Sequence, residues 1–255
     1  MSEPIFTGVG VALLTLFDDR GDIDDAATAD HAGRLVDLGV RAVVVTGSTG
    51  EAAALEPYER VALLAAVRAA VGGHVPVIAG TGAPSARQAI AHTAAAADRG
   101  ADAVLVLSPP GAPDPRPYYD AVAKAATDLP LLAYHFPAAS APGIPVALLP
   151  NLPVAGCKDS SGDPERLLEE LAVFDRPIYV GSAAVLSLAG PLGCTGAILA
   201  LANAEPERCI AAFAGDVAAQ RELTAAHRAA KRSFPNGIKE LTAARFGTST
   251  TARMG

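Results

Sequence analysis

The 255-residue chain has no tryptophan, two methionines and three cysteines, and only 5% of its residues are aromatic. The cysteines, Cys157, Cys194 and Cys209, have neither the paired spacing of a disulfide framework nor the spacing of a metal site. The sequence thus excludes a small disulfide-stapled scaffold. We expect all three cysteines to pack as apolar side chains in a reducing compartment.

Positive charge is also scarce. Lysine and arginine number 20 against 27 acidic residues, the net charge is −7, and no basic run or arginine stripe is present. This balance argues against nucleic acid as a partner. Charges interrupt the alanine-rich segments, so we expect no membrane span. Residues 1–4 are not a positive segment followed by an apolar run, so we expect no signal peptide and a cytoplasmic protein.

The chain does contain short apolar, β-branched runs that alternate with longer alanine-rich segments of helical spacing. Continuous apolar strands joined by helices indicate a parallel sheet that is covered on both faces. Eight such strands in about 200 residues predict a (β/α)8 barrel, the TIM-barrel fold of the α/β class. The strands are expected at residues 9–14, 42–46, 75–79, 103–107, 131–134, 154–158, 178–180 and 197–199.

A doubly wound open sheet is the competing architecture. That fold usually has a glycine-rich phosphate turn after its first strand, whereas residues 17–22 read Phe-Asp-Asp-Arg-Gly-Asp. Two of the expected helices carry recognisable starts, with Ser85 as one cap and Asp163 before Pro164 as another. Helices are expected at residues 24–38, 57–71, 85–99, 115–127 and 164–174.

After the eighth strand the pattern is only helical. One helix covers residues 206–213 and leads into a polar helix that ends near Arg232, and a last helix runs to Gly247. We therefore divide the chain into a barrel catalytic domain, residues 1–204, and a short C-terminal helical extension, residues 205–255. The tail, residues 248–255, is expected to fray.

Lys158 is one of only four lysines, and it ends the apolar strand 154–158. Desolvation at such a place disfavours the charged ammonium, lowers its pKa and leaves an amine that can attack a carbonyl. A structural ion pair with Asp159 is the alternative, and the strand alone favours that alternative. The residues that follow the other strands change this judgement.

Polar and small residues follow the strands, and in a parallel barrel these carboxyl ends meet on one face. Ser48 and Thr49 follow the second strand and offer hydroxyl and amide donors to a carboxylate. Tyr134, at the end of the fifth strand, can carry protons, and Lys158 can form a Schiff base with a ketone. A ketone beside a carboxylate is a 2-oxo acid, and pyruvate is the smallest common one.

Each of these residues also has a structural interpretation. Ser48 and Thr49 could simply cap the next helix, and a tyrosine such as Tyr134 is more often a half-buried core residue. Because they occur together with Lys158 at three strand ends, we favour the functional interpretation of all these residues over the structural one.

Four motifs in this order resemble the dihydrodipicolinate synthase/N-acetylneuraminate lyase family of pyruvate-dependent class I aldolases. The resemblance runs from about Gly8 to Ala204, and more loosely through residues 235–245. The motifs are Gly-Ser-Thr-Gly-Glu at 47–51, Tyr134 with Pro137, Gly-Cys-Lys-Asp-Ser-Ser-Gly at 156–162 and Gly-Cys-Thr-Gly-Ala-Ile at 193–198.

The resemblance implies a role for each matching residue. Lys158 would form the imine, and Tyr134 would shuttle protons. Ser48 and Thr49 would bind the substrate carboxylate, with Ser48 also in the proton relay. Ile198 would supply a backbone contact near the imine, and Gly47 would allow close backbone approach. No cofactor is implied, and a homo-oligomer, a dimer or a tetramer, is expected.

The chain departs from the synthases of this family at two places. A Tyr-Tyr pair follows their fourth strand, and its second tyrosine reaches across a dimer interface to complete a proton relay. In this chain residues 109–111 read Pro-Pro-Gly. Tyr118 and Tyr119 are expected in a helix and are not expected to replace the relay tyrosine. An arginine that holds the aldehyde's carboxylate in those synthases is also missing from residues 138–141, Ala-Ala-Ser-Ala. Both departures argue against the lysine-pathway assignment, and the Gly-Ser-Thr-Gly-Glu form at 47–51 is more similar to the lyase and sugar-acid aldolase branches.

Several neighbouring residues are assigned structural roles. Glu51 is expected in a first helical turn, where the dipole favours an anion. His135 faces opposite Tyr134 and is expected to pack outside the barrel, with a place near the distal part of the substrate as the alternative. Cys157 faces opposite Lys158 as filler, and Asp159 and Ser160 either line the pocket or bond within their loop. The other histidines lack ligand spacing, so no metal is expected; they are His31, His74, His92 and His227.

The sequence thus predicts a carbon–carbon lyase that cleaves an aldol reversibly into pyruvate and an aldehyde through Lys158. The first alternative keeps the imine but differs in the reaction that follows: the protein is a 2-oxo sugar-acid dehydratase or catalyses a dihydrodipicolinate synthase-type condensation. A non-catalytic 2-oxo acid binding paralogue is the second. Residues 108–117 and 138–145 are expected to shape the aldehyde end, and their Pro, Ala and Gly content suggests a partner less polar than a phosphorylated sugar.

Overall fold

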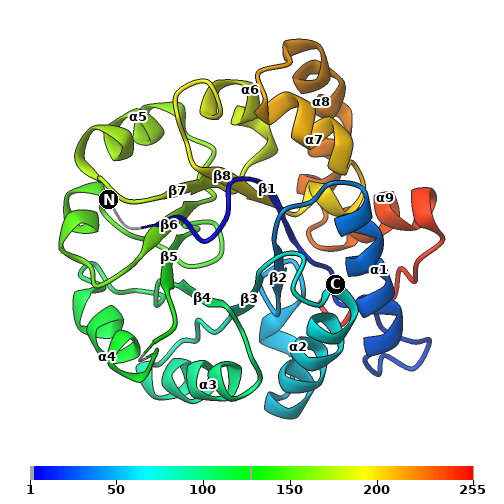
Figure 1. The fold of residues 1–255 in the computed structure, drawn as a ribbon, viewed down its shortest axis with the longest axis horizontal. Helices are drawn as coiled ribbons and strands as arrows, with labels where there is room; N and C mark the ends of the chain where they lie inside the picture. Colours follow the sequence, from blue (N-terminus) through cyan, green and yellow to red (C-terminus); the bar gives the residue numbers. More distant parts are fainter. Residues whose placement is uncertain (1–2, 127, 255) are drawn as a thin grey trace.

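Eight parallel strands close into one barrel in the computed structural model, which describes residues 3–126 and 128–254. Strand β1 pairs with β8, with Val9 opposite Ala197, so the sheet has no open edge. Figure 1 shows the helices arranged around the strands. The predicted TIM barrel is confirmed. The strands are β1 (Gly8–Ala12), β2 (Val43–Val45), β3 (Val77–Gly80), β4 (Ala103–Leu107), β5 (Leu131–His135), β6 (Gly156–Asp159), β7 (Ile178–Val180) and β8 (Gly196–Leu199).

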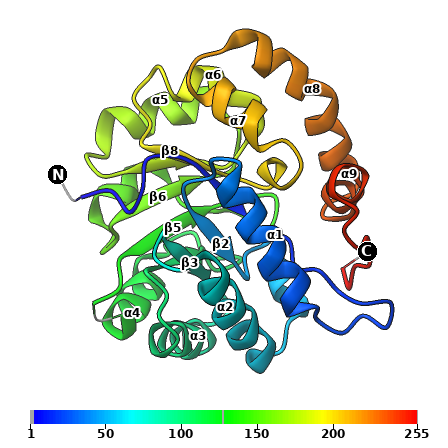
Figure 2. The ribbon, with the colours of Figure 1, turned by 45° about the vertical axis from the view of Figure 1, so that its right-hand side comes forward.

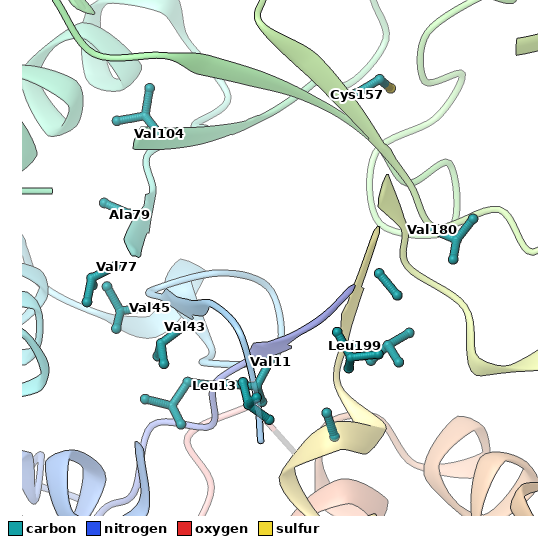
Figure 3. Close-up of a cluster of buried hydrophobic side chains, with 14 of the residues drawn as sticks. Val11, Leu13, Val43, Val45, Val77, Ala79, Val104, Cys157, Val180 and Leu199 are labelled. Carbon is teal, nitrogen blue, oxygen red and sulfur yellow. The ribbon is translucent and has the colours of Figure 1, made fainter. Parts of the chain in front are cut away.

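Continuous apolar strands arise because both faces of this sheet are buried. In β2, Val43 and Val45 point outward into the layer between barrel and helices, while Val44 belongs to the smaller cluster inside the barrel. Figure 3 shows side chains of the outer layer, among them Cys157, around the outside of the ring of strands. The inner cluster contains Tyr134, which places that residue on the inward face.

The helices between the strands are close to those expected. Ser85 accepts a hydrogen bond from the Gln88 amide at 3.3 Å, and Asp163 accepts one from the Glu165 amide at 2.9 Å. Thr127, the expected end of one helix, lies outside the described residues. The helices that cover the barrel are α1 (Asp25–Asp37), α2 (Pro57–Val71), α3 (Ala86–Asp98), α4 (Arg116–Ala126), α5 (Pro164–Val173) and the short α6 (Leu186–Ala189).

Four short 3-10 helices, which the sequence did not predict, join the larger elements. They are η1 (Ala52–Ala54), η2 (Val146–Asn151), η3 (Ala183–Val185) and η4 (Leu201–Asn203). Three of them, η1, η3 and η4, directly follow the loops after β2, β7 and β8. They therefore help to shape the face at which the strands end.

Helices α7 (Pro206–Phe213), α8 (Val217–Arg232) and α9 (Asn236–Phe246) form the predicted C-terminal extension. In Figure 2, α8 and α9 lie at the right and α7 lies near α6 in the upper part of the view. The expectation that the tail frays is wrong for its described part. The Arg253 guanidinium donates to both carboxylate oxygens of Glu59 at 2.7 Å, and its backbone amide donates to Glu51 at 2.8 Å. The tail is therefore bound to the segment around η1 and α2. The boundary between residues 204 and 205 stays a prediction.

Within the described residues, no helix has both the length and the apolar character that a membrane crossing needs. The prediction that no signal peptide is present rests on residues 1–4, of which residues 1 and 2 lie outside the described residues.

Candidate active site

A cavity of about 1000 Å³ opens at the carboxyl ends of the strands. It brings together four of the predicted site residues, since Ser48, Thr49, Tyr134 and Lys158 all line it. Gly47 and Ile198 are not among the lining residues. Ile198 is fully buried in the cluster inside the barrel, so its predicted backbone contact stays a prediction.

Lys158 is the basic group at the inner end of this cavity. It is only 4% exposed, and it stands in register between Tyr134 on β5 and Tyr179 on β7, so the three side chains share the inward face. Its Nζ lies 4.3 Å from the centre of the Tyr134 ring. Burial lowers the pKa of the Lys158 amine to about 7. A substantial fraction is therefore a neutral nucleophile near neutral pH.

The ion pair between Lys158 and Asp159 that the strand pattern favoured does not form. Asp159 instead accepts hydrogen bonds from the Ser161 amide at 2.7 Å and hydroxyl at 2.9 Å, and it pairs with Arg166 at 3.5 Å. In the described part of the chain, no carboxylate lies within ion-pairing distance of Lys158. Asp159 thus holds its own loop together, one of the two roles considered for it.

Tyr134 connects two of the loops around the cavity. Burial raises the pKa of the Tyr134 phenol, and the neighbouring hydroxyls of Ser160 and Ser48 oppose part of that rise. The ring stacks on Phe136, with the ring centres 5.8 Å apart. The phenol therefore has two hydroxyl partners through which a proton can pass.

Ser160 lines the cavity, and glycine at position 181 makes room for it. A Cβ on Gly181 would lie 1.8 Å from Ser160 Oγ and 2.9 Å from Lys158 Cε. The Ser160 hydroxyl and the end of the Lys158 side chain thus border the same point in space. Sequence reasoning left the role of Ser160 open; its position two residues after a nucleophilic lysine was the only available signal.

The Ser48–Thr49 loop does not cap the helix that follows it. Glu51 is the residue before η1 and makes no side-chain cap, and the capping box of α2 is formed by Glu56 and Glu59. The structural alternative for this loop is therefore wrong. A Cβ at Gly80 would lie 2.4 Å from the Thr46 carbonyl oxygen, so only glycine allows the neighbouring strand end to approach this loop.

His135 packs outside the barrel, as expected from its alternation with Tyr134. It is 4% exposed, its Nδ1 accepts a hydrogen bond from the Ile144 amide at 2.9 Å, and it is absent from the cavity wall. Burial, with the Arg166 charge, lowers the pKa of His135 to about 4. Cys157 is likewise buried in the outer layer, which confirms its packing role.

The position of the missing relay tyrosine remains without an aromatic group. Gly111 is in the left-handed region with φ of 72°. Tyr118 and Tyr119 lie in α4 and donate to the carbonyls of Ala83 at 3.0 Å and Val106 at 2.9 Å. Neither lines the cavity. They do not replace the relay residue, as expected.

Sequence reasoning missed the part of the wall that comes from distant elements. Arg60 on α2 lines the cavity and donates to the carbonyls of Ala52 and Gly80, on either side of the Ser48 loop. The extension contributes a further group, and only the three-dimensional packing brings it here: His227, Lys231, Phe234, Ile238 and Met254. Searched over the described residues, the chain has no cluster of three or more His, Cys, Asp or Glu side chains that could hold a metal.

Comparison with known proteins places this site in a family context. A family model described as "Dihydrodipicolinate synthetase family" matches residues 5–244. The chain is 38% identical over 215 residues to an uncharacterized DapA-like lyase of Halobacterium salinarum, and the aligned region covers 81% of this chain and 70% of the relative. It is 37% identical over 238 residues to a 4-hydroxy-tetrahydrodipicolinate synthase of Natronomonas pharaonis, which covers 88% of this chain and 80% of that one.

Among solved structures, the chain resembles YagE, a prophage protein of the dihydrodipicolinic acid synthase family from E. coli K12 that was solved in complex with pyruvate. The TM-score is 0.89 at 27% sequence identity, over 98% of this chain and 92% of YagE. Sequence and fold comparisons thus agree along nearly the whole chain.

Proposed function

The chain belongs to the dihydrodipicolinate synthetase family and is a carbon–carbon lyase of the class I aldolase type, and from this premise we propose that Lys158 forms an imine with pyruvate or a related 2-oxo acid. The observation that carries the proposal is a buried lysine whose pKa is lowered to about 7 and which opens into the cavity beside Tyr134. A neutral amine is the form that adds to a ketone.

The proposed cleavage begins when the Lys158 amine adds to C2 of a 4-hydroxy-2-oxo acid and water leaves, giving the imine. Tyr134 passes its phenolic proton to a neighbouring hydroxyl and takes the proton of the C4 hydroxyl as the C3–C4 bond breaks. The electron pair of that bond becomes the C2=C3 bond of an enamine, the π pair of the protonated imine moves to nitrogen, and the aldehyde leaves. A proton returned through Tyr134 to C3, followed by hydrolysis, releases pyruvate and restores the amine.

The carboxylate of the 2-oxo acid is assigned to the loop that carries Ser48 and Thr49. Both residues line the cavity, and Thr49 is 5% exposed, so a hydrogen bond to the carboxylate is sheltered from water. The hydroxyls of Ser160 and Ser48 beside Tyr134 give the phenol two routes by which to exchange its proton. These routes would serve in place of the relay tyrosine that is missing at Gly111.

The aldehyde partner occupies the outer part of the cavity in this proposal. The loops at residues 108–117 and 138–145 contribute mostly Pro, Ala and Ser to the wall. Cationic or imidazole side chains from helices also line it, namely Arg60, His92, His227 and Lys231. The complete lining thus gives no support to the expectation of a weakly polar partner, and hydroxylated or anionic aldehydes belong in the substrate panel.

Trapping the imine tests the proposal. Incubation with pyruvate and borohydride should add the mass of reduced pyruvate to the peptide that carries Lys158, and Lys158→Arg should remain unlabelled. A wild-type protein that stays unmodified while a known aldolase is labelled would refute it. Product analysis then separates aldol cleavage, which releases an aldehyde, from dehydration or condensation. Binding of a panel of 2-oxo acids with neither label nor product would identify the binding paralogue.

The predicted homo-oligomer, which rests on the family resemblance, and the cytoplasmic location, which rests on the sequence, remain proposals. Light scattering behind a sizing column gives the mass of the particle in solution. A mass of one chain would contradict the dimer or tetramer.

A further inference from the structure

The loop that carries Ser48 and Thr49 begins and ends with strained residues. Thr46 and Glu51 have φ values of 52° and 56°, in the left-handed region that residues with a Cβ rarely occupy, and a β-branched threonine least of all. A residue in this strained conformation persists only where its surroundings hold it there. Two backbone hydrogen bonds within the loop, from the Glu51 amide to the Ser48 carbonyl at 3.1 Å and from the Ala52 amide to the Gly47 carbonyl at 3.2 Å, support the shape, and contacts from outside the loop add to them.

On one side these contacts come from the barrel itself. The Thr46 hydroxyl donates to the Gly80 carbonyl at 3.1 Å, and the Thr15 hydroxyl donates to the Gly50 carbonyl at 2.7 Å. These bonds link the loop to β3 and to the segment after β1. They leave the left-handed Glu51, at the far end, to be held by something else.

Glu51 is held from the C-terminal extension. Its side chain is completely buried, and Lys239 of α9, also completely buried, places its Nζ 2.6 Å from Glu51 Oε1. Glu51 Oε2 accepts the backbone amides of Arg253 at 2.8 Å and Met254 at 2.6 Å. The expected structural role of Glu51 is confirmed, but a lysine and the tail amides stabilise its charge, in place of the first turn of a helix. A buried carboxylate with charged and amide partners is a rigid anchor, because breaking any partner leaves an uncompensated charge.

The tail is itself fastened to the segment that follows the loop. The Arg253 guanidinium binds Glu59 through two hydrogen bonds and donates to the carbonyls of Gly21 at 2.7 Å and Ala54 at 3.0 Å. Lys239 Nζ donates to the Thr251 carbonyl at 2.5 Å. The guanidinium thus keeps the amides of residues 253 and 254 at the Glu51 carboxylate.

We propose that Glu51 is a positioning residue, and that Lys239 and the tail amides of Arg253 and Met254, acting through it, hold the Ser48–Thr49 loop in the shape that receives the 2-oxo acid carboxylate. The inference rests on the function proposed above. It assigns to the C-terminal extension a part in substrate binding, in addition to its part in the cavity wall.

Arg253→Ala is the test variant, because the arginine side chain is 22% exposed and its loss should not prevent folding. Arg245→Ala is the matched control. Arg245 also lies in the extension and makes an ion pair, with Glu207 at 2.6 Å, but its partners, Glu207 and the Ala204 carbonyl, lie outside the loop. Arg253→Lys keeps the charge but loses the paired geometry, so it should rescue only in part.

Two measurements separate positioning from general destabilisation. Without ligand, Arg253→Ala should speed hydrogen exchange of the backbone amides in residues 47–52, while Arg245→Ala should not. With ligand, Arg253→Ala should raise KM for the 2-oxo acid about tenfold and change kcat less than about twofold, because the imine chemistry at Lys158 is untouched.

Exchange that is unchanged in Arg253→Ala would overturn the inference, and so would faster exchange with an unchanged KM. A wild-type protein that traps no pyruvate on Lys158 would instead overturn the proposed function, while the exchange measurement would still decide whether the tail holds the loop. If Arg253→Ala does not fold, Lys239→Met is measured in the same two ways. Slow exchange in residues 47–52 of that variant would contradict the inference.

Discussion

Removal from water is the one physical cause that lowers the pKa of the Lys158 amine and so makes it a nucleophile near neutral pH. Since its pKa in the folded protein is about 7, the neutral amine is the minority form at pH 6 and the majority form at pH 8. The rate of imine formation with pyruvate should therefore rise through this interval and level off above it. Stopped-flow or quench trapping against pH measures the rate. A midpoint near the ordinary lysine pKa of 10.5 would contradict the assignment.

The same burial predicts that Lys158 destabilises the fold. Its pKa is lower in the folded than in the unfolded chain, so the unfolded chain binds more protons between about pH 7 and 10.5, and stability rises with pH across that window. Each unit by which the pKa is lowered is about 1.4 kcal/mol, so Lys158→Met should raise the free energy of unfolding by about 5 kcal/mol at pH 6 and by about 2 kcal/mol at pH 9. Urea unfolding at the two pH values measures both, and an equal gain at each would contradict the account.

Tyr134 is predicted to act after the imine has formed. Tyr134→Phe removes the hydroxyl that contacts Ser48 and Ser160 but keeps the ring beside the lysine. We expect kcat to fall about 10²–10⁴-fold while borohydride still traps pyruvate on Lys158. A parallel loss of trapping would mean that the phenol is needed for imine formation itself. Ser160→Ala, measured alongside, reports how much of the proton traffic uses that hydroxyl.

At the scale of single residues, the sequence predicted those site residues whose type is uncommon at their position in the fold. A lysine at the end of an apolar strand and a Ser-Thr pair after another strand are visible without a structure. The partners of Glu51 are not, since Lys239 and Arg253 come from segments with no periodic or motif relation to it. Adjacency in sequence favoured the pairing of Lys158 with Asp159, although the strand alternation that placed Cys157 opposite Lys158 applies to Asp159 as well.

Among the elements, α5 supports the loop that follows Lys158. Its cap, Asp163, accepts the Glu165 amide, and Arg166 in its first turn pairs with Asp159 of that loop. Asp163→Ala should lower the free energy of unfolding by about 1 kcal/mol and leave kcat within about twofold. Chemical denaturation and steady-state kinetics test this. The exposed Glu169→Ala is the control, and an equal loss of stability there would remove the capping explanation.

The strands and long helices were predictable because their signals are local. Buried runs such as Val43–Val45 and the cap of α5 show in the sequence itself. The 3-10 helices and the short α6 carry too few residues for a period to show. Strand ends moved by one or two residues, because hydrogen bonding to neighbours, which the sequence does not show, decides where a strand stops.

For the molecule as a whole, a ligand that binds only the folded state should stabilise it. Pyruvate at about 100 times its Kd should raise the free energy of unfolding by about 2.7 kcal/mol. Lactate has the same carboxylate but no ketone, so it should stabilise less at equal concentration. Thermal unfolding with each ligand checks this. Equal shifts would show that the carboxylate alone accounts for binding and would count against an imine.

The overall architecture followed from the order of strands and helices, but the course of the tail did not. Nothing in residues 248–254 has helical or strand spacing, so fraying was the natural expectation. The tail is ordered because it brings polar groups to a buried carboxylate, and a buried charge requires such partners.

The anchoring of Glu51 also sets an order of events while the chain is being made. Residues 51 and 253 are 202 positions apart, which at a synthesis rate of about 5–20 residues per second is about 10–40 s. All eight strands leave the ribosome before the amides that hold the carboxylate loop. A nascent chain could thus close its barrel and still lack affinity for its substrate. The substrate affinity of a nascent chain then shows whether the tail amides have bound the Glu51 carboxylate.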